Sequence, residues 1–292
     1  MAVATLPTYS TPVGKAVWLA AFGLVTGATF VLDRRERGSL ARRSRVLSTP
    51  RGSVEVEITS AGPDVLVLHG SGGGFDQGTW LAHALALRGH RVISMSRPGY
   101  LRTPDLETND DAVELGVAML DALGVERAAV IGWSAGGMSA CGLAMRHPAR
   151  VSALVMLSAV SGPVTSTGLP LALYFVRTGS HVNRAILAAM GTPTGRRLIA
   201  ELARTLAAPE RRLPGVLRDI AISRSFPAPK AVVVPTLVIH GTADGAVPFE
   251  HAERTAAGCT NGELVTIRGG GHFCCMTHQD VGGRVRAFLA ST

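Results

Sequence analysis

The chain alternates between short, continuous apolar runs and longer segments that carry an apolar residue at every third or fourth position. The first pattern is typical of strands buried on both faces of a sheet, and the second of helices with one apolar face. Residues 54–58 instead alternate apolar and polar positions, as in a strand with one buried face. Strands are predicted at residues 54–58, 65–70, 91–96, 128–133, 151–159, 236–240 and 263–267, and helices at 79–87, 108–123, 135–146, about 250–257 and after 278.

This alternation predicts an α/β fold with a mostly parallel, doubly wound sheet and helices on both of its faces. The alternation breaks between residues 162 and 230, where no strand pattern occurs. We expect this insertion to form a helical cap, or lid, over a core made of residues 51–161 and 231–292. Its helices are predicted at residues 169–176, 182–190, 196–206 and 213–223.

Residues 1–50 form a segment of different character. Residues 16–32 carry no charge, and their length is at the lower limit for a helix that spans a membrane. Arginines crowd the carboxyl side of this run, between residues 34 and 45, and positive flanks tend to stay cytoplasmic. We expect a membrane anchor with a cytoplasmic catalytic domain; a helix packed on a soluble cytoplasmic domain and a signal peptide are the alternatives.

Composition narrows the functional classes. Hydrophobic residues make up 47% of the chain and charged residues 17%, which supports a large buried core. The net charge is +8, but residues 1–50 hold seven cations against two acids and so account for +5 of it. The body therefore shows no basic stripe, and we expect no nucleic-acid partner. The four cysteines are not spaced as metal ligands or as a disulfide framework, so we expect free thiols and no metal.

The sequence of residues 132–136, GWSAG, fits the pattern G-x-S-x-G, in which Ser134 is the central residue. A buried strand is predicted before it and a helix after it. Such a sharp turn needs small residues on both sides of the serine, and it lifts the hydroxyl above the sheet. Ser134 is therefore the candidate nucleophile.

A serine hydroxyl needs a base, and the base needs an orienting acid. His272 lies in a Gly-rich loop after the last predicted strand, and Asp244 follows the strand at 236–240. Sites in open α/β sheets form where the strands' carboxyl ends meet, so these side chains are expected to converge on Ser134. The backbone N–H groups of Ser71, in the turn HGSGGG at 69–74, and of Ala135 are the candidate oxyanion donors.

Together these motifs resemble the α/β-hydrolase superfamily, in the serine-nucleophile branch with a helical cap, over roughly residues 50–292. The resemblance implies the α/β-hydrolase fold, with Ser134 as nucleophile, Asp244 as acid and His272 as base. The chain departs from the family at the Arg-Pro-Gly-Tyr loop of residues 97–100. Ser96 stands where many members have Asp, and Leu101 where many have Gly. The resemblance therefore does not predict how this loop packs.

The expected activity is hydrolysis of a carboxylic ester or related acyl substrate with an apolar part, through an acyl-serine intermediate. Thioester hydrolysis, acyl transfer and carbon–carbon hydrolysis use the same triad and stay open, as does a non-catalytic ligand-binding protein. Trp133, Gly72 and Phe273 neighbour the catalytic candidates and are predicted to bind substrate. We expect a small-molecule acyl substrate as partner and no cofactor; the sequence leaves the oligomeric state open.

Overall fold

The computed structural model describes residues 38–163, 193–205 and 208–292. Strands in this part form one sheet in the order β1-β2-β4-β3-β5-β6-β7-β8, in which β2 pairs antiparallel with both β1 and β4 and all other neighbours pair parallel. The predicted α/β-hydrolase architecture is therefore confirmed. The strands are β1 (Arg45–Thr49), β2 (Gly52–Thr59), β3 (Asp64–Leu68), β4 (Arg91–Met95), β5 (Ala128–Trp133), β6 (Val151–Leu157), β7 (Thr236–Gly241) and β8 (Gly262–Ile267).

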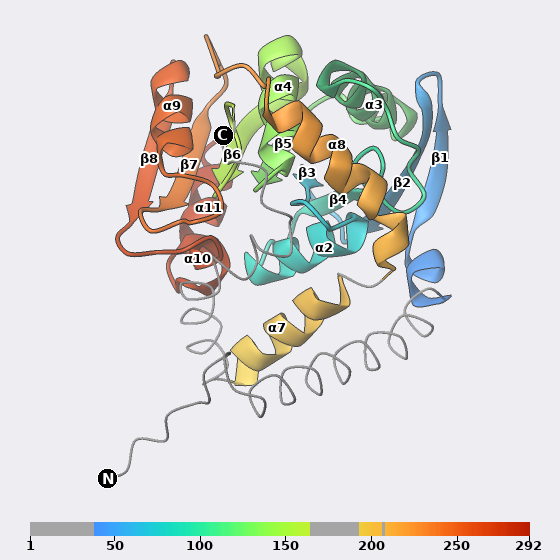
Figure 1. The fold of residues 1–292 in the computed structure, drawn as a ribbon, viewed down its shortest axis with the longest axis horizontal. Coiled ribbons are helices and arrows are strands. Elements are labelled where there is room, and N and C mark those ends of the chain that lie inside the picture. Colours follow the sequence, from blue (N-terminus) through green and yellow to red (C-terminus); the bar gives the residue numbers. More distant parts are fainter. Residues whose placement is uncertain (1–37, 164–192, 206–207) are drawn as a thin grey trace, which may run out of the picture.

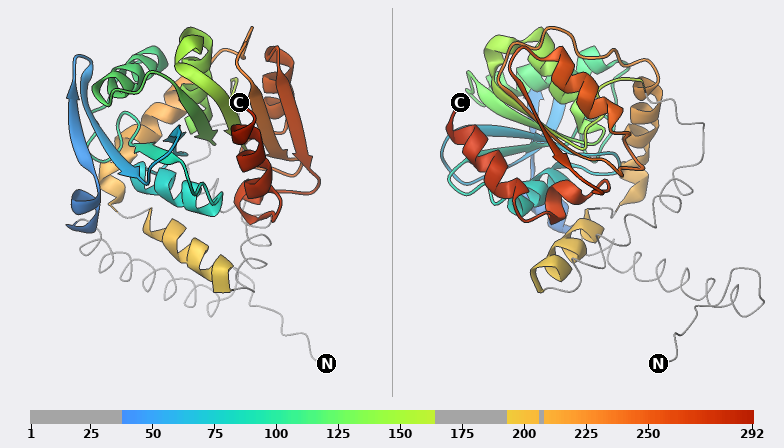
Figure 2. Two further views of the ribbon diagram at one scale, coloured as in Figure 1. Left: turned by 180° about the vertical axis from the view of Figure 1, so that it is seen from behind. Right: turned by 90° about the vertical axis from the view of Figure 1, so that its left-hand side faces the viewer.

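Helices cover both faces of the sheet (Figures 1 and 2). Side chains alternate along the central strands, so Leu66 and Val130 enter the core under α3, α4 and α9, while Val67 and Ile131 enter the core under α2 and α11. The helices are α2 (Phe75–Ala84), α3 (Asn109–Ala122), α4 (Gly136–Arg146), α7 (Pro193–Arg204), α8 (Leu213–Ser223), α9 (Glu250–Gly258), α10 (Cys274–Thr277) and α11 (Val281–Ala290).

The first strand, β1, was not predicted; its residues fall within 1–50, which were interpreted as an N-terminal segment separate from the core. It pairs with β2, whose acids Glu55 and Glu57 are buried in spite of their charge. Arg43 binds Glu57 through two hydrogen bonds, of 3.0 and 2.9 Å, and Ser44 donates to Glu55 over 2.7 Å. The residues just before β1 therefore neutralise and solvate carboxylates inside the core.

The predicted membrane anchor, residues 16–32, lies outside the described residues and stays a prediction. Among the residues that are described, none of the helices has the length and apolar character needed to cross a bilayer.

The predicted cap is described from residue 193 onward, where it contains α7 and α8; the helices predicted at 169–176 and 182–190 lie outside the described part. Helix α8 crosses the loops at the carboxyl ends of the central strands (Figure 1). The Gly215 N–H donates to Gly99 O over 2.9 Å, and the Leu101 N–H donates to Arg211 O over 2.7 Å. Main-chain hydrogen bonds therefore fix this end of the cap to the loop of residues 97–101.

Leu101 adopts a left-handed backbone with φ 54°, the conformation for which glycine is usual. Ser96 accepts a hydrogen bond from the Phe75 N–H at the start of α2 and donates to Glu55. Both departures from the family pattern are thus accommodated: the leucine takes the glycine conformation, and Glu55 of β2 supplies a carboxylate beside the loop.

Candidate active site

Ser134 occupies the turn between β5 and α4 in a left-handed conformation with φ 53°. Its N–H donates to Leu157 O over 3.1 Å, and its carbonyl accepts from the Val160 N–H over 2.8 Å, so the strained turn is held by the neighbouring strand. A Cβ atom at Gly136 would lie 2.2 Å from Leu68 O, which explains why the turn needs a glycine there. The backbone therefore presents the Ser134 hydroxyl above the sheet.

The structure brings Ser134, His272 and Asp244 together although they come from three separate loops. Ser134 Oγ lies 3.0 Å from His272 Nε2, and His272 Nδ1 lies 2.9 Å from Asp244 Oδ2. An ionised carboxylate only accepts hydrogen bonds, so Nδ1 carries the imidazole proton and Nε2 is free to accept the serine proton. The Asp244 side chain is fully buried and that of His272 is 11% exposed, which leaves the base partly accessible.

Asp244 is held as a carboxylate by its surroundings. The N–H groups of Ala246 and Val247 donate to its Oδ1 over 2.8 and 2.9 Å. Burial alone would raise the pKa of this carboxyl, but His272, His240 and the Val247 N–H outweigh burial and hold the pKa well below its usual range. The acid is therefore ionised at neutral pH and points at the base.

The predicted oxyanion donors lie in the turn after β3 and at the start of α4, next to Ser134 in the chain. The turn after β3 approaches the nucleophile closely, because a Cβ atom at Gly70 would be 3.1 Å from Ser134 Cβ. Within the described part of the chain, neither the Ser71 nor the Ala135 N–H donates to another residue. The Ala135 N–H precedes the first turn of α4, where the helix dipole favours negative charge.

The residues predicted to bind substrate differ in their surroundings. Trp133 is 4% exposed and its ring stacks on that of His272, with 5.9 Å between centroids. Phe273 is half-buried and packs edge-on against Trp133. The Gly72 N–H is engaged, because it donates to the Tyr100 hydroxyl over 3.3 Å. Trp133 thus supports the base from one side, Phe273 keeps a partly open surface, and Gly72 belongs to a hydrogen-bonded turn.

Comparison with known proteins agrees with this geometry. The model of the "Alpha/beta hydrolase family" matches residues 65–285, which include all three residues of the triad geometry. The chain belongs to the α/β-hydrolase family. The prediction made from the motifs is thereby confirmed.

Curated relatives of this α/β-hydrolase carry the names of two kinds of hydrolase. A "2-hydroxy-6-oxononadienedioate/2-hydroxy-6-oxononatrienedioate hydrolase 1" of Dechloromonas aromatica is 29% identical over 240 residues, which is 74% of this chain and 82% of the relative. A "Pimeloyl-[acyl-carrier protein] methyl ester esterase" of Vibrio atlanticus is 28% identical over 245 residues, or 76% of this chain and 92% of the relative. Carbon–carbon and ester hydrolases are thus both among its homologues.

Among solved structures, an α/β-hydrolase fold protein from Nakamurella multipartita superposes with a TM-score of 0.73. The two sequences are 34% identical, and the match covers 84% of this chain and 98% of the other. The fold of this α/β-hydrolase is therefore seen almost whole in a related protein.

Sequence reasoning missed several side chains that shape the site of this α/β-hydrolase. Gln77 accepts a hydrogen bond from the Gly70 N–H over 2.9 Å and so fixes the turn after β3. His240 is fully buried and its Nε2 lies 3.3 Å from Asp244 Oδ2. Asp219 of α8 reaches the loop of residues 97–101 from the cap. Gln77 follows Asp76 in α2 and Asp219 follows Arg218 in α8, so no local pattern set either residue apart from its polar neighbours.

Proposed function

We propose that this protein is a serine hydrolase that cleaves a carboxylic ester, or a related acyl substrate with an apolar part, through an acyl-enzyme intermediate. The observation that carries the proposal is the continuous chain of hydrogen bonds from Ser134 Oγ through His272 to Asp244. The left-handed turn at Ser134 supports it, because this strain is typical of functional residues. Ser134, His272 and Asp244 take the roles of nucleophile, base and acid.

In the first half of the reaction, His272 Nε2 accepts the hydroxyl proton while Ser134 Oγ attacks the substrate carbonyl carbon. The carbonyl oxygen becomes an oxyanion, which the Ser71 and Ala135 N–H groups stabilise; losing one such donor costs roughly 10²–10³ in turnover. The imidazolium then gives its proton to the leaving oxygen, and the alcohol departs. Asp244 keeps the imidazole oriented and stabilises its charged form.

In the second half, a water molecule replaces the alcohol. His272 Nε2 accepts a proton from the water, whose oxygen attacks the acyl carbon of the ester on Ser134. A second tetrahedral intermediate forms in the same oxyanion site and collapses as His272 returns the proton to Ser134 Oγ. The carboxylic acid leaves and the resting enzyme is restored.

Hydrolysis of p-nitrophenyl esters from acetate to laurate tests the proposal. Wild type should release nitrophenolate, and Ser134→Ala should reduce kcat by roughly 10⁶-fold, as expected when a triad nucleophile is lost. Ser139→Ala is the matched control, because Ser139 is a buried serine five residues further on whose hydroxyl makes, within the described part of the chain, one long hydrogen bond of 3.4 Å to Asn109. Ester turnover that survives in Ser134→Ala would remove the serine from the mechanism.

Carbon–carbon hydrolysis on the same triad is the second candidate. The 29% identical relative from Dechloromonas aromatica is named for a 2-hydroxy-6-oxo-dienedioate substrate, and the turn at 69–72 resembles that of such enzymes. Hydrolysis of a 2-hydroxy-6-oxo-dienoate can be followed by the loss of its absorbance. A kcat/KM for this substrate that is higher than that for every ester would favour carbon–carbon hydrolysis. A folded protein that neither turns over these substrates nor reacts with a fluorophosphonate would instead be a non-catalytic ligand-binding protein.

A further inference from the structure

The Arg-Pro-Gly-Tyr loop, residues 97–100, has no part in the mechanism above, yet it holds a deeply buried charge near the site, that of Arg97. Arg97 is 1% exposed, and its guanidinium binds Asp219 of α8 through two hydrogen bonds of 2.7 Å. The Arg97 Nε also donates to His69 O over 2.9 Å, at the start of the oxyanion turn. One fork-shaped ion pair therefore joins the cap helix to the loops after β3 and β4.

The Tyr100 hydroxyl extends this ion pair to the oxyanion turn. It donates its one proton to Asp219 Oδ2. Its lone pairs face Ser71 Oγ and the Gly72 N–H, each 3.3 Å away. Because the phenol proton is already used, Ser71 Oγ must be the donor in its pair with Tyr100. Burial, and then the Asp219 charge, raise the pKa of Tyr100, so the phenol stays protonated and the order of donors is fixed.

Those contacts decide which group of the turn can reach an oxyanion. The Ser71 hydroxyl proton points at Tyr100, and the Gly72 N–H is occupied by the same oxygen. The Ser71 N–H donates to no other residue in the described part of the chain. Two of these three groups are thus bound to the Tyr100 hydroxyl, and within the described chain the Ser71 N–H is the one that remains available to an oxyanion.

We propose that Tyr100 and Asp219 are positioning residues for the oxyanion site, through which helix α8 of the cap holds the Ser71–Gly72 turn in its working orientation. The inference rests on the serine-hydrolase function proposed above. It assigns α8 a fixed place during turnover: were α8 to lift away, the Tyr100 hydroxyl would lose the Asp219 carboxylate that directs its proton and so keeps its lone pairs toward the turn.

The packing of α8 supports this fixed place. The Tyr100 ring lies so close to α8 that a Cβ atom at Gly215 would be 2.2 Å from it. A Cβ atom at Gly99 would likewise be 2.6 Å from the Gly215 nitrogen. Helix and loop thus touch main chain to main chain, a fit that leaves little freedom for sliding.

Tyr100→Phe is the sharpest test, because it removes the hydroxyl and keeps both the ring and the ion pair. We expect kcat for a p-nitrophenyl ester to fall roughly 10- to 100-fold through a misplaced donor, with KM within about threefold of wild type. A trifluoromethyl ketone, which forms an oxyanion on the serine, should bind more weakly by the same factor as kcat/KM. Thr236→Val is the control, since it removes a buried hydroxyl at the amino end of β7, opposite the carboxyl ends of the strands where the site lies.

Hydrogen exchange of residues 70–74 provides a readout that does not depend on activity. Exchange at the Gly72 amide should be faster in Tyr100→Phe than in wild type, because its acceptor is gone. A variant with wild-type exchange, kcat and ketone affinity would overturn the inference while leaving the triad intact. A wild-type enzyme inert toward esters and fluorophosphonate would defeat the proposed function, and the positioning role would fall with it.

Discussion

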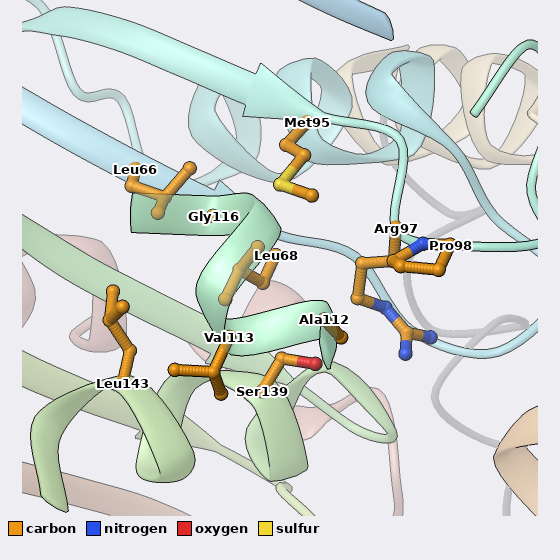
Figure 3. A pocket seen from close by; sticks show the side chains of 10 residues that line it. All are labelled: Leu66, Leu68, Met95, Arg97, Pro98, Ala112, Val113, Gly116, Ser139 and Leu143. Carbon is orange, nitrogen blue, oxygen red and sulfur yellow. The ribbon is translucent and has the colours of Figure 1, made fainter. Parts of the chain in front are cut away.

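A small void beside helix α3 allows the core packing to be tested by a single methyl group. The void has a volume of about 10 Å³ and lies between β3, β4, α3 and α4 (Figure 3). Gly116, in the middle of α3, lies on its wall. A Cβ atom built at Gly116 meets no heavy atom within 4 Å, so Gly116→Ala should fit without rearrangement.

The expected gain has two sources. Alanine is favoured over glycine in a helix interior by about 0.8–1.0 kcal/mol. A buried methyl group that fills empty space adds up to about 0.8 kcal/mol. We therefore expect Gly116→Ala to raise the free energy of unfolding by about 1–1.5 kcal/mol, and Tm by roughly 3–5 °C.

Gly142→Ala on the facing helix α4 is a matched control with the opposite expectation. The gain in helix propensity is the same, but a Cβ atom there would lie 2.8 Å from Val113 Cγ2 and 2.9 Å from Asn109 Nδ2. Overpacking of this kind costs about 1–3 kcal/mol, which exceeds the propensity gain. The substitution should therefore lower the stability.

Urea denaturation followed by far-UV circular dichroism measures both variants, provided the m-values stay equal to that of wild type. A Gly116→Ala midpoint at or below the wild-type value would refute the argument that the void accepts a methyl group. Equal stabilisation by both variants would mean that helix propensity, and not packing, decides the outcome.

Three further predictions concern the groups around the triad. Asp244→Asn should lower kcat for an ester by roughly 10⁴-fold through the wrong imidazole tautomer, and normal turnover in a nitrophenyl assay would contradict this. Because the pKa of Asp244 is depressed, its contribution to stability is present above the usual carboxyl pKa and lost as pH falls through the folded value. As pH falls below 5, the free energy of unfolding of wild type should therefore decrease more than that of Asp244→Asn. The difference should grow by at most about 1.4 kcal/mol per pH unit. Burial, and then the charge of Arg254, lowers the pKa of His251 to about 4. Wild type should therefore lose stability as pH falls from about 6.5 toward 4, because the unfolded chain binds the proton more readily. Over this pH range the urea midpoint of His251→Asn should change less than that of wild type.

The parts of the fold that sequence patterns predicted well are those whose signals are local. The limits of β5 and α8 agree with the predicted ones, since both patterns end at clear boundaries. The turn at Ser134 was predictable because its glycines, its strand and its helix are neighbours in the chain. The approach of His272 and Asp244 was predictable from a general rule, that sites form at the carboxyl ends of parallel strands.

Features that depend on distant partners escaped prediction. Helix α2 begins at Phe75 and not at residue 79, because its first N–H is capped by Ser96 from another loop. The five residues of β1 are defined as a strand only by their pairing with β2. The hydrogen bond between Tyr100 and Asp219 joins residues 119 positions apart, so the sequence around either residue does not predict its partner.

The two acids of β2 limit how far the chain can be truncated at its amino end. A fragment that starts at residue 51, where the core was expected to begin, keeps Glu55 and Glu57 but removes Arg43 and Ser44. Glu57 would lose its guanidinium partner while staying in an interior where an unpaired carboxylate costs several kcal/mol. We expect such a fragment to be recovered from inclusion bodies, and one that starts at residue 38 to be recovered in solution. We therefore expect the smallest autonomous folding unit to include the basic residues just before β1.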